Sequence, residues 1–286
     1  MADGPAQDAG EAGMPRKQGR RQQGAGERGH APCKPRPPAR VNGAGPAIGP
    51  LPPRRADLWG PDLRRIAPMT QTTPPPGTLK AAQDVGRDWI EAAYFAEAEP
   101  AAEMQWATII LPFLQVEATG IDLSVTMDLA AGRGRNAAKL LPMAGRLHIV
   151  DIHASNVALC RARFGEDPRI AYAANDGCSL PVPDATLSFL FCFDAMVHFD
   201  SDVVRAYLAE ARRALRPGGH AFLHHSNDMS LAGGDFRRHP HWRNTMSLAL
   251  MRHYAAKEGL LVVRQQPLDW AHDGSDIDGL TLLRAP

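Results

Sequence analysis

Residues 127–140, MDLAAGRGRNAAKL, decide the fold class of this chain. An apolar run ends in an aspartate, two glycines follow one residue apart, and a stretch with helical spacing comes next. Gly132 and Gly134 let the backbone turn sharply and let a ligand approach more closely than a Cβ would permit. Backbone amides at the start of the next helix add donors and partial positive charge. The stretch therefore predicts a strand, a ligand-binding loop and a helix.

Short apolar runs and helical segments alternate around this loop. The strands that this pattern predicts are 124–130, 146–152, 169–174, 186–194, 220–226 and, as a final antiparallel pair, 261–270 and 280–284. The predicted helices are 79–95, 101–115 (ending near Pro112), 135–141, 154–164, 201–215 and 241–260 (stopping at Gly259). Nearly continuous apolar runs are typical of parallel strands covered on both faces. We therefore expect a doubly wound, mostly parallel α/β sheet of seven strands, preceded by a helical lead-in.

The N-terminal residues have a different composition from the rest of the chain. Residues 1–77 hold 15 of the 25 prolines and 12 of the 26 glycines, and they contain no serine. Such a segment buries too little apolar surface to offset its chain entropy, so we expect a disordered extension before a domain at 78–286. The extension carries 12 Lys+Arg against 6 Asp+Glu, a formal charge of +6 that leaves −5 for the remainder. Its arginines have no interleaved aromatic residues, which argues against specific nucleic-acid binding.

The sequence shows no sign of export or of membrane insertion. The first residues lack the apolar core of a signal peptide, and no run of about 18 apolar residues occurs. Four cysteines, at positions 33, 160, 178 and 192, lack metal-ligand spacing and are expected to be reduced thiols. These features predict a soluble, cytoplasmic protein, and they leave its oligomeric state open.

Three carboxylates narrow the choice of ligand. Asp151 lies 19 residues beyond Gly132, after the second predicted strand, where it could accept both hydroxyls of a ribose. Asp128 precedes the glycines, at the expected mouth of the site, where it would attract an ammonium or sulfonium group. Asp176 follows the third strand and could accept from an adenine amino group. The pattern GRGRNA alone also fits a dinucleotide site, but the two further acids favour a cationic nucleoside.

The motifs DLAAGRGR, VDI, NDGCSLPVPDATLSFLFCFDAMVHF and LRPGGHAFL together resemble, in order and spacing, the class I S-adenosylmethionine-dependent methyltransferases. The resemblance runs from about residue 79 to the C-terminus. It implies S-adenosylmethionine as the cofactor, and Ala130 stands where the family's first loop glycine is usual. The cofactor-binding residues that it implies are Asp128, Ala130, Gly132, Gly134, Asp151, Ile152, Asn175, Asp176, Gly177, Phe193 and Asp194.

Histidines at the ends of the fourth and fifth predicted strands are candidate general bases. Methyl transfer from a sulfonium depends mainly on positioning and desolvation, and a base is needed only when the acceptor keeps its proton. A neutral imidazole can take that proton, and His198 is the first candidate and His225 the second. Each histidine has the alternative of a hydrogen-bonded strand-end residue. A metal at the HHSN stretch, 224–227, is a minor alternative because no acidic cluster accompanies it, so no metal is expected.

Polar residues near the same edge are candidates for acceptor binding: His224, Ser226, Trp242 and Arg243. Trp242 and Arg243 could hold a ring and an anionic group, or they could form a helix N-terminal turn packed on the sheet. In the lead-in, Trp89, Tyr94 and Trp106 are expected to be core or lid residues rather than acceptor contacts.

We therefore expect a methyltransferase that acts on a small molecule, with a hydroxyl of a sugar or natural product as the first choice of acceptor. A nitrogen, protein or RNA acceptor is an alternative, as is a non-catalytic S-adenosylmethionine-binding protein. A nicotinamide oxidoreductase is a distant alternative, because the chain has no Tyr-x-x-x-Lys pair and the extra acids would be unexplained.

Overall fold

The computed structural model describes residues 76–88, 94–115, 120–230 and 243–286. Its elements in chain order are α1 (Pro76–Asp88), α2 (Tyr94–Gln105), the π-helical turn η2 (Trp106–Ile110), α3 (Leu111–Gln115), β1 (Val125–Leu129), α4 (Ala137–Leu140), β2 (Arg146–Asp151), α5 (Ala154–Phe164), β3 (Ile170–Ala174), β4 (Leu187–Cys192), the 3-10 turn η3 (Met196–His198), α6 (Ser201–Ala214), β5 (Leu215–Ser226), α7 (Leu248–Lys257), β6 (Leu261–Leu268) and β7 (Asp278–Arg284). The predicted N-terminal extension lies outside the described residues except for its last two residues, which begin α1.

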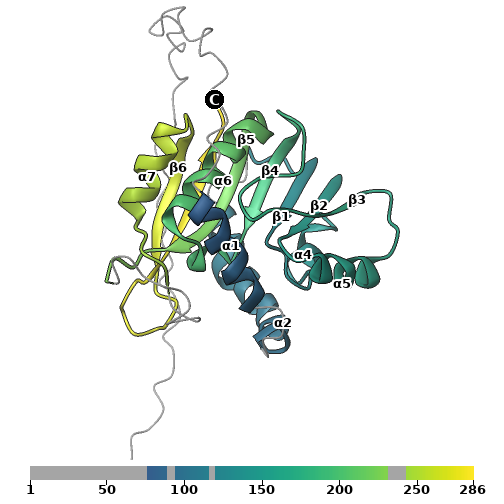
Figure 1. Cartoon of the computed structure of the whole chain (residues 1–286), viewed down its shortest axis with the longest axis horizontal. Coiled ribbons are helices and arrows are strands. Elements are labelled where there is room, and N and C mark those ends of the chain that lie inside the picture. Colours follow the sequence, from purple (N-terminus) through teal and green to yellow (C-terminus); the bar gives the residue numbers. More distant parts are fainter. Residues whose placement is uncertain (1–75, 89–93, 116–119, 231–242) are drawn as a thin grey trace, which may run out of the picture. The chain divides into compact units, whose positions relative to one another are not determined.

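The seven strands form one sheet in the order β3-β2-β1-β4-β5-β7-β6 (Figure 1). β1 pairs in parallel with β2 and β4, and the pairs β2–β3 and β4–β5 are also parallel. β7 is antiparallel to both of its neighbours, β5 and β6. The predicted mostly parallel sheet with a final antiparallel pair is confirmed. The chain runs outward from β1 to β3 and then returns to β4, so the carboxyl ends of β1 and β4 flank the switch point where such sheets bind ligands.

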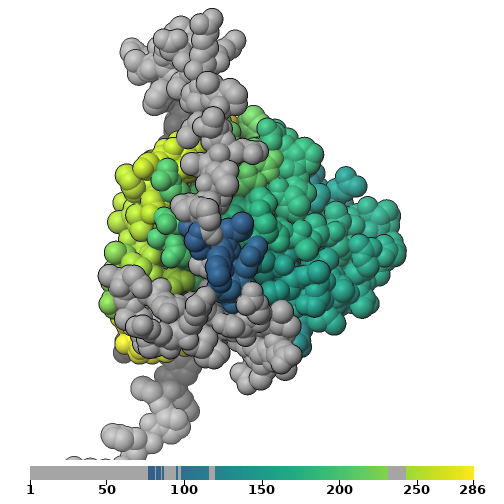
Figure 2. Space-filling view, in the orientation of Figure 1, coloured from purple at the N-terminus to yellow at the C-terminus, as the bar shows by residue number. Residues whose placement is uncertain are grey.

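Each face of the sheet buries its own apolar cluster because side chains alternate along a strand. On one face, Met127 and Leu190 pack with side chains of α6 and α7, and Ala82 of α1 joins them. On the other face, Phe189 and Phe191 pack with Trp106, with α4 and with α5. Cover on both faces explains the continuous apolar runs in the sequence. In the space-filling view, α1 lies at the surface between the C-terminal elements and the β1–β3 half of the sheet (Figure 2).

The N-terminal helices differ in their bounds from the predicted ones. The segment predicted as one helix, 79–95, spans the end of α1 and the start of α2, with 89–93 outside the described residues. The helical path continues past Pro112 to Gln115, slightly beyond the expected end near the proline. Pro112 is the second residue after the wider turn η2. Such a turn already departs from the regular hydrogen-bond ladder, so it accommodates a residue that has no N–H to donate.

The C-terminal helix begins later than its apolar spacing suggests. α7 starts at Leu248 because the Ser247 hydroxyl caps it, accepting a hydrogen bond from the backbone N of Leu250 at 3.1 Å. Gly259 has φ +73° just after the helix, as expected for a residue at that position. Within the ranges that the structure describes, no helix is long and apolar enough to cross a membrane.

Candidate active site

A cavity with an empty volume of about 900 Å³, including its open mouth, lies at the carboxyl ends of β1, β2, β3 and β4. α1, α2 and α6 contribute further walls, among them Gly86, Phe95 and Tyr207. The cavity is therefore at the switch point of the sheet. The predicted cofactor residues that line it are Ala130, Gly132, Asp151, Ile152, Asn175, Gly177 and Asp194.

A second, smaller cavity of about 370 Å³ adjoins the first at the glycine loop. Residues that line both are Phe95, Ala130, Gly132 and Asp194. The smaller cavity adds the charged side chains of Arg133 and Arg135, and it also contains the predicted residue Phe193. The larger cavity thus presents Asp151 and Asp194, and the smaller one presents Asp194 and Glu99 together with the two arginines of the loop.

The glycine loop owes its shape to backbone conformations with positive φ. Ala130 has φ +57° and Gly132 has φ +55°, and a Cβ on Gly132 would lie 2.7 Å from the ring of Phe95. Gly134 has φ +81°, and a Cβ there would lie 2.7 Å from the ring of Phe164 on α5. Gly132 therefore lets α2 approach the loop, whereas Gly134 lets α5 pack against it. Gly134 lines neither cavity, and its predicted contact with the cofactor stays a prediction.

Asp151 joins the end of β2 to the glycine loop. Its Oδ2 accepts a hydrogen bond from the backbone N of Gly132 at 2.8 Å. Its Oδ1 accepts from the backbone N of His153 at 2.9 Å and from Asn156 Nδ2 at 3.2 Å. The side chain is 5% exposed, and burial raises its pKa against the lowering effect of these hydrogen bonds. Asp151 therefore holds the loop in place and presents an acid to the cavity.

Asp128 lies beneath the loop rather than at the mouth of the site, so that part of the prediction is wrong. The residue is 1% exposed and lines neither cavity, and its Oδ2 has no hydrogen-bond partner. Burial raises the pKa of Asp128 to about 8. The positive charge of Arg135 lowers this pKa, and the nearby Asp151 raises it further. The carboxyl is therefore mostly protonated at neutral pH, and it attracts a cation less than the expected carboxylate would.

This shift predicts a pH-dependent stability that Asp128→Asn removes. The pKa of Asp128 in the folded protein lies above its unfolded value of 3.8. Protonated Asp128 therefore stabilises the fold fully below about pH 4, and this stabilisation is lost as the pH rises through about 8. At pH 8 the variant should exceed the wild type in unfolding free energy by about 1–3 kcal/mol, because a neutral amide replaces a buried carboxylate. Urea unfolding at pH 5 and pH 8 measures this difference. Equal slopes of stability against pH in the two proteins would contradict the assignment.

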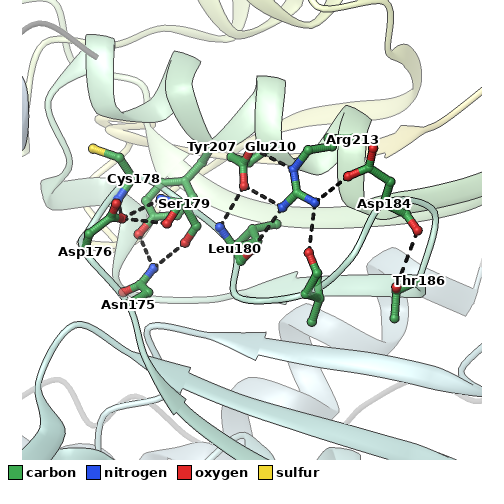
Figure 3. A network of polar contacts seen from close by, with 11 residues as sticks. Asn175, Asp176, Cys178, Ser179, Leu180, Asp184, Thr186, Tyr207, Glu210 and Arg213 are labelled. Carbon is green, nitrogen blue, oxygen red and sulfur yellow. Dashed lines mark hydrogen bonds and ion pairs between the residues drawn. The ribbon is translucent and has the colours of Figure 1, made fainter. Parts of the chain in front are cut away.

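The loop after β3 carries a network of polar contacts (Figure 3). Asp176 Oδ1 accepts from the backbone N of Cys178 at 2.9 Å and from the backbone N and hydroxyl of Ser179 at 2.7 and 2.9 Å. Asp176 is exposed and lines neither cavity. Asn175 does line the larger cavity, and its Nδ2 donates to Ser179 O at 2.8 Å and to the Tyr207 hydroxyl at 2.9 Å. Both amide hydrogens are thereby engaged, which leaves Asn175 Oδ1 to accept from a ligand.

We therefore expect Asn175, more than its acidic neighbour, to contribute to cofactor affinity. Asn175→Ala should weaken binding of S-adenosylhomocysteine about tenfold, the effect of one lost hydrogen bond. Asp176→Asn is the matched control, because asparagine keeps the Oδ1 acceptor that closes the turn. The affinity of this variant for S-adenosylhomocysteine should stay within about threefold of the wild type. Calorimetric titration compares the two. A larger loss in Asp176→Asn than in Asn175→Ala would reverse the assignment.

The segment after β4 places two predicted residues at the cavity. Asp194 has φ +59°, and its carboxylate forms an ion pair with Arg135 of the glycine loop at 2.5 Å. His198, the last residue of η3, lines the larger cavity and is 9% exposed. Its backbone carbonyl accepts a hydrogen bond from Asn244 Nδ2. His198 is thus the candidate base that the fold brings to the site.

The predicted residues at the end of β5 do not reach either cavity. His225 is fully buried, with Nδ1 near Ser226 O and Nε2 near the Thr281 hydroxyl, both at 2.8 Å. Burial lowers the pKa of His225 to about 4, and the structure places this second candidate base away from both cavities. Ser226 is also fully buried, and its hydroxyl accepts from the backbone N of Asp228 at 3.1 Å. The side chains of His225 and Ser226 are therefore buried in the protein interior and do not face the cavities.

The structure also places His224 and Arg243, two of the predicted acceptor residues, away from both cavities. His224 is fully buried and contacts Asp278, and Arg243 donates to both oxygens of that carboxylate at 2.7 and 2.6 Å. Trp242 and its predicted ring contact lie outside the described residues. In the part of the chain that the structure describes, no group of three or more His, Cys, Asp or Glu side chains could hold a metal.

Arg135, His153 and Tyr207 are among the cavity residues that the sequence did not predict. Arg135 joins the loop to α2, donating to Ala98 O at 3.2 Å and to Gln105 Oε1 at 3.0 Å. His153 lines the larger cavity, and its Nε2 is buried without a partner. Tyr207 lines it from α6. The first two lie within three residues of predicted residues and could have been proposed from that spacing, but nothing local marks Tyr207.

Comparison with known proteins agrees with this fold. Residues 126–219 match a family model described as a methyltransferase domain. An S-adenosylmethionine-dependent methyltransferase from Mesorhizobium loti is 16% identical with a TM-score of 0.51, over 60% of this chain and 96% of that one. Geranyl diphosphate C-methyltransferase from Streptomyces coelicolor A3(2) is 12% identical with a TM-score of 0.54, over 72% of this chain and 98% of that one. The search of curated proteins found no match.

At these identities the solved structures establish the fold, and the family model covers the segment from β1 into β5 that carries the loop and the acids. The cavities at the switch point lie within that segment and the helices that cover it. Residues 126–219 thus match a methyltransferase domain, and the sheet that contains them has the fold of class I S-adenosylmethionine-dependent methyltransferases.

Proposed function

We propose that the chain transfers the methyl group of S-adenosylmethionine to a hydroxyl of a small molecule, such as a sugar or natural product, with His198 as general base. The observation that carries this proposal is the position of His198, which lines the same cavity as Gly132 and Asp151. An imidazole beside the cofactor loop is placed to accept a proton from a hydroxyl as the methyl group arrives.

The two adjoining cavities suit an elongated ligand with a nucleoside at one end and a charged group at the other. In the larger cavity, Asp151 and Asn175 offer acceptors and Ile152 offers an apolar surface. In the smaller cavity, Arg133 offers a cation and Asp194 an anion, which match the carboxylate and ammonium of an amino acid. We infer that the cofactor's nucleoside lies in the larger cavity and its amino-acid end in the smaller.

The cofactor supplies a methyl group on a sulfonium, and the chain's residues orient the acceptor and exclude water. α1 lies close over the cavity, since a Cβ on Gly86 would lie 2.9 Å from His153 Nε2. Phe199 and Val203 add apolar wall beside His198. A cavity of about 900 Å³ has the size of a small-molecule site, which supports a small acceptor rather than a protein or an RNA.

A cytoplasmic location is part of this proposal. Cys160, Cys178 and Cys192 are buried free thiols, a state that fits a reducing compartment.

Incubation of the full chain with methyl-labelled S-adenosylmethionine and a panel of sugars, phenols, amines, protein and RNA tests the proposal. Label recovered in an ether of a hydroxylated small molecule is the expected result. Label found only in amines, protein or RNA would overturn the choice of acceptor. Binding of S-adenosylhomocysteine without transfer to any acceptor would favour a non-catalytic binding protein instead.

A further inference from the structure

A chain of buried polar contacts runs beneath the segment that follows β4. Asp278, the first residue of β7, is fully buried and is held by the Arg243 guanidinium on one side. On the other side, His224 Nε2 lies 3.0 Å from Asp278 Oδ2. None of these three side chains lines either cavity. The proposed methyl transfer does not use them directly, although His224 contacts the backbone of Asp194.

The contacts of His224 fix its tautomer. The backbone N of Asp194 donates a hydrogen bond to His224 Nδ1 at 3.1 Å, so Nδ1 carries no proton. A neutral imidazole then carries its proton on Nε2, which donates to the Asp278 carboxylate. One neutral form satisfies both contacts, whereas an imidazolium would have no acceptor for the Asp194 amide.

The amide that His224 holds belongs to a residue with an uncommon backbone conformation at the centre of the site. Asp194 has φ +59°, a left-handed conformation that few residues other than glycine, asparagine and aspartate adopt. That conformation accompanies the ion pair of its carboxylate with Arg135. Asp194 also lines both cavities, and the turn that ends in His198 begins two residues later. The hydrogen bond from the Asp194 amide to His224 therefore supports the backbone at the junction of the cavities.

We propose that His224 is a positioning residue: its unprotonated Nδ1 holds the backbone of Asp194, and thereby the Asp194 carboxylate, in the place where the cofactor's charged end binds. Asp278 and Arg243 fix the imidazole in the required tautomer. The inference rests on the proposed placement of the cofactor in the two cavities, and it gives the buried residues of β5 and β7 a part in binding.

Two substitutions separate the two contacts of His224. His224→Asn keeps an acceptor close to the position of Nδ1 but is too short to reach Asp278. His224→Gln keeps a donor close to the position of Nε2 but lacks the acceptor for Asp194. Titration of each full-length variant with S-adenosylhomocysteine should give an affinity within about threefold of the wild type for Asn and about tenfold weaker for Gln. The proposal would be overturned if His224→Gln kept the wild-type affinity while His224→Asn lost affinity. Equal losses of affinity in the two variants would also overturn it.

Hydrogen exchange at the Asp194 amide is a second readout that does not depend on the cofactor. The amide should exchange slowly in the wild type and in His224→Asn, and rapidly in His224→Gln. If neither variant folds, rapid exchange in the wild type alone would still overturn the role of His224. Slow exchange in the wild type without binding of S-adenosylhomocysteine would overturn the cofactor placement and keep the hydrogen bond.

Discussion

Replacement of His198 by alanine should lower turnover by about 10²-fold or more and leave the affinity for S-adenosylhomocysteine within about threefold of the wild type. The reason is that general-base catalysis contributes about 10²–10⁴-fold to the rate when the acceptor keeps its proton. His198 lines the larger cavity, whereas His224 and His225 do not. Turnover with the acceptor found by the labelling screen, measured beside cofactor titration, gives both numbers.

His253→Ala is a matched control for this prediction, because His253 is exposed on α7 and lines neither cavity. Its turnover should equal that of the wild type. An unchanged rate in His198→Ala with the true acceptor would exclude His198 as the base. A parallel loss of turnover and of cofactor affinity would instead assign His198 to cofactor binding.

Asp151→Ala should weaken cofactor binding by about 1–3 kcal/mol, or roughly 5- to 150-fold. The substitution removes the acceptor for the backbone N of Gly132 and the one shared by His153 and Asn156. The amide of Gly132 then lies buried without a partner, and the cavity loses its acid. Both effects reduce affinity, since the loop that lines both cavities is no longer held.

Asp167→Ala is a suitable control, because Asp167 lies outside both cavities and pairs with the exposed Arg169. Its affinity for S-adenosylhomocysteine should match the wild type. Titration that finds the same affinity in Asp151→Ala as in Asp167→Ala would refute the assignment of Asp151.

Much of the fold could be predicted from the sequence because its signals are local. The predicted helix 154–164 matches α5 in both bounds, since a polar, extended residue precedes it and Gly165 follows it. The strands were recognisable as short apolar runs, and the expected antiparallel pair at the end of the sheet is present. The glycine loop could likewise be found, because the positive φ of Gly132 is required by its own turn.

The positions that the sequence did not predict depend on contacts between distant residues. His225 contacts Thr281, 56 positions later, and Arg243 contacts Asp278, 35 positions later. No local pattern shows that a strand-end histidine points into the sheet rather than into the cavity. Asp128 was misplaced for a related reason: burial beneath the loop depends on how the loop and the residues around it pack, and a motif does not specify that packing.

Calorimetric titration of the full chain with S-adenosylmethionine, S-adenosylhomocysteine and NADH, in parallel, tests the central claim most directly. The two adjoining cavities, with Asp151 in one and Arg133 in the other, predict micromolar binding of the first two ligands and none of NADH. Binding of NADH alone would contradict the assignment of the glycine loop to S-adenosylmethionine, and with it the account of the site.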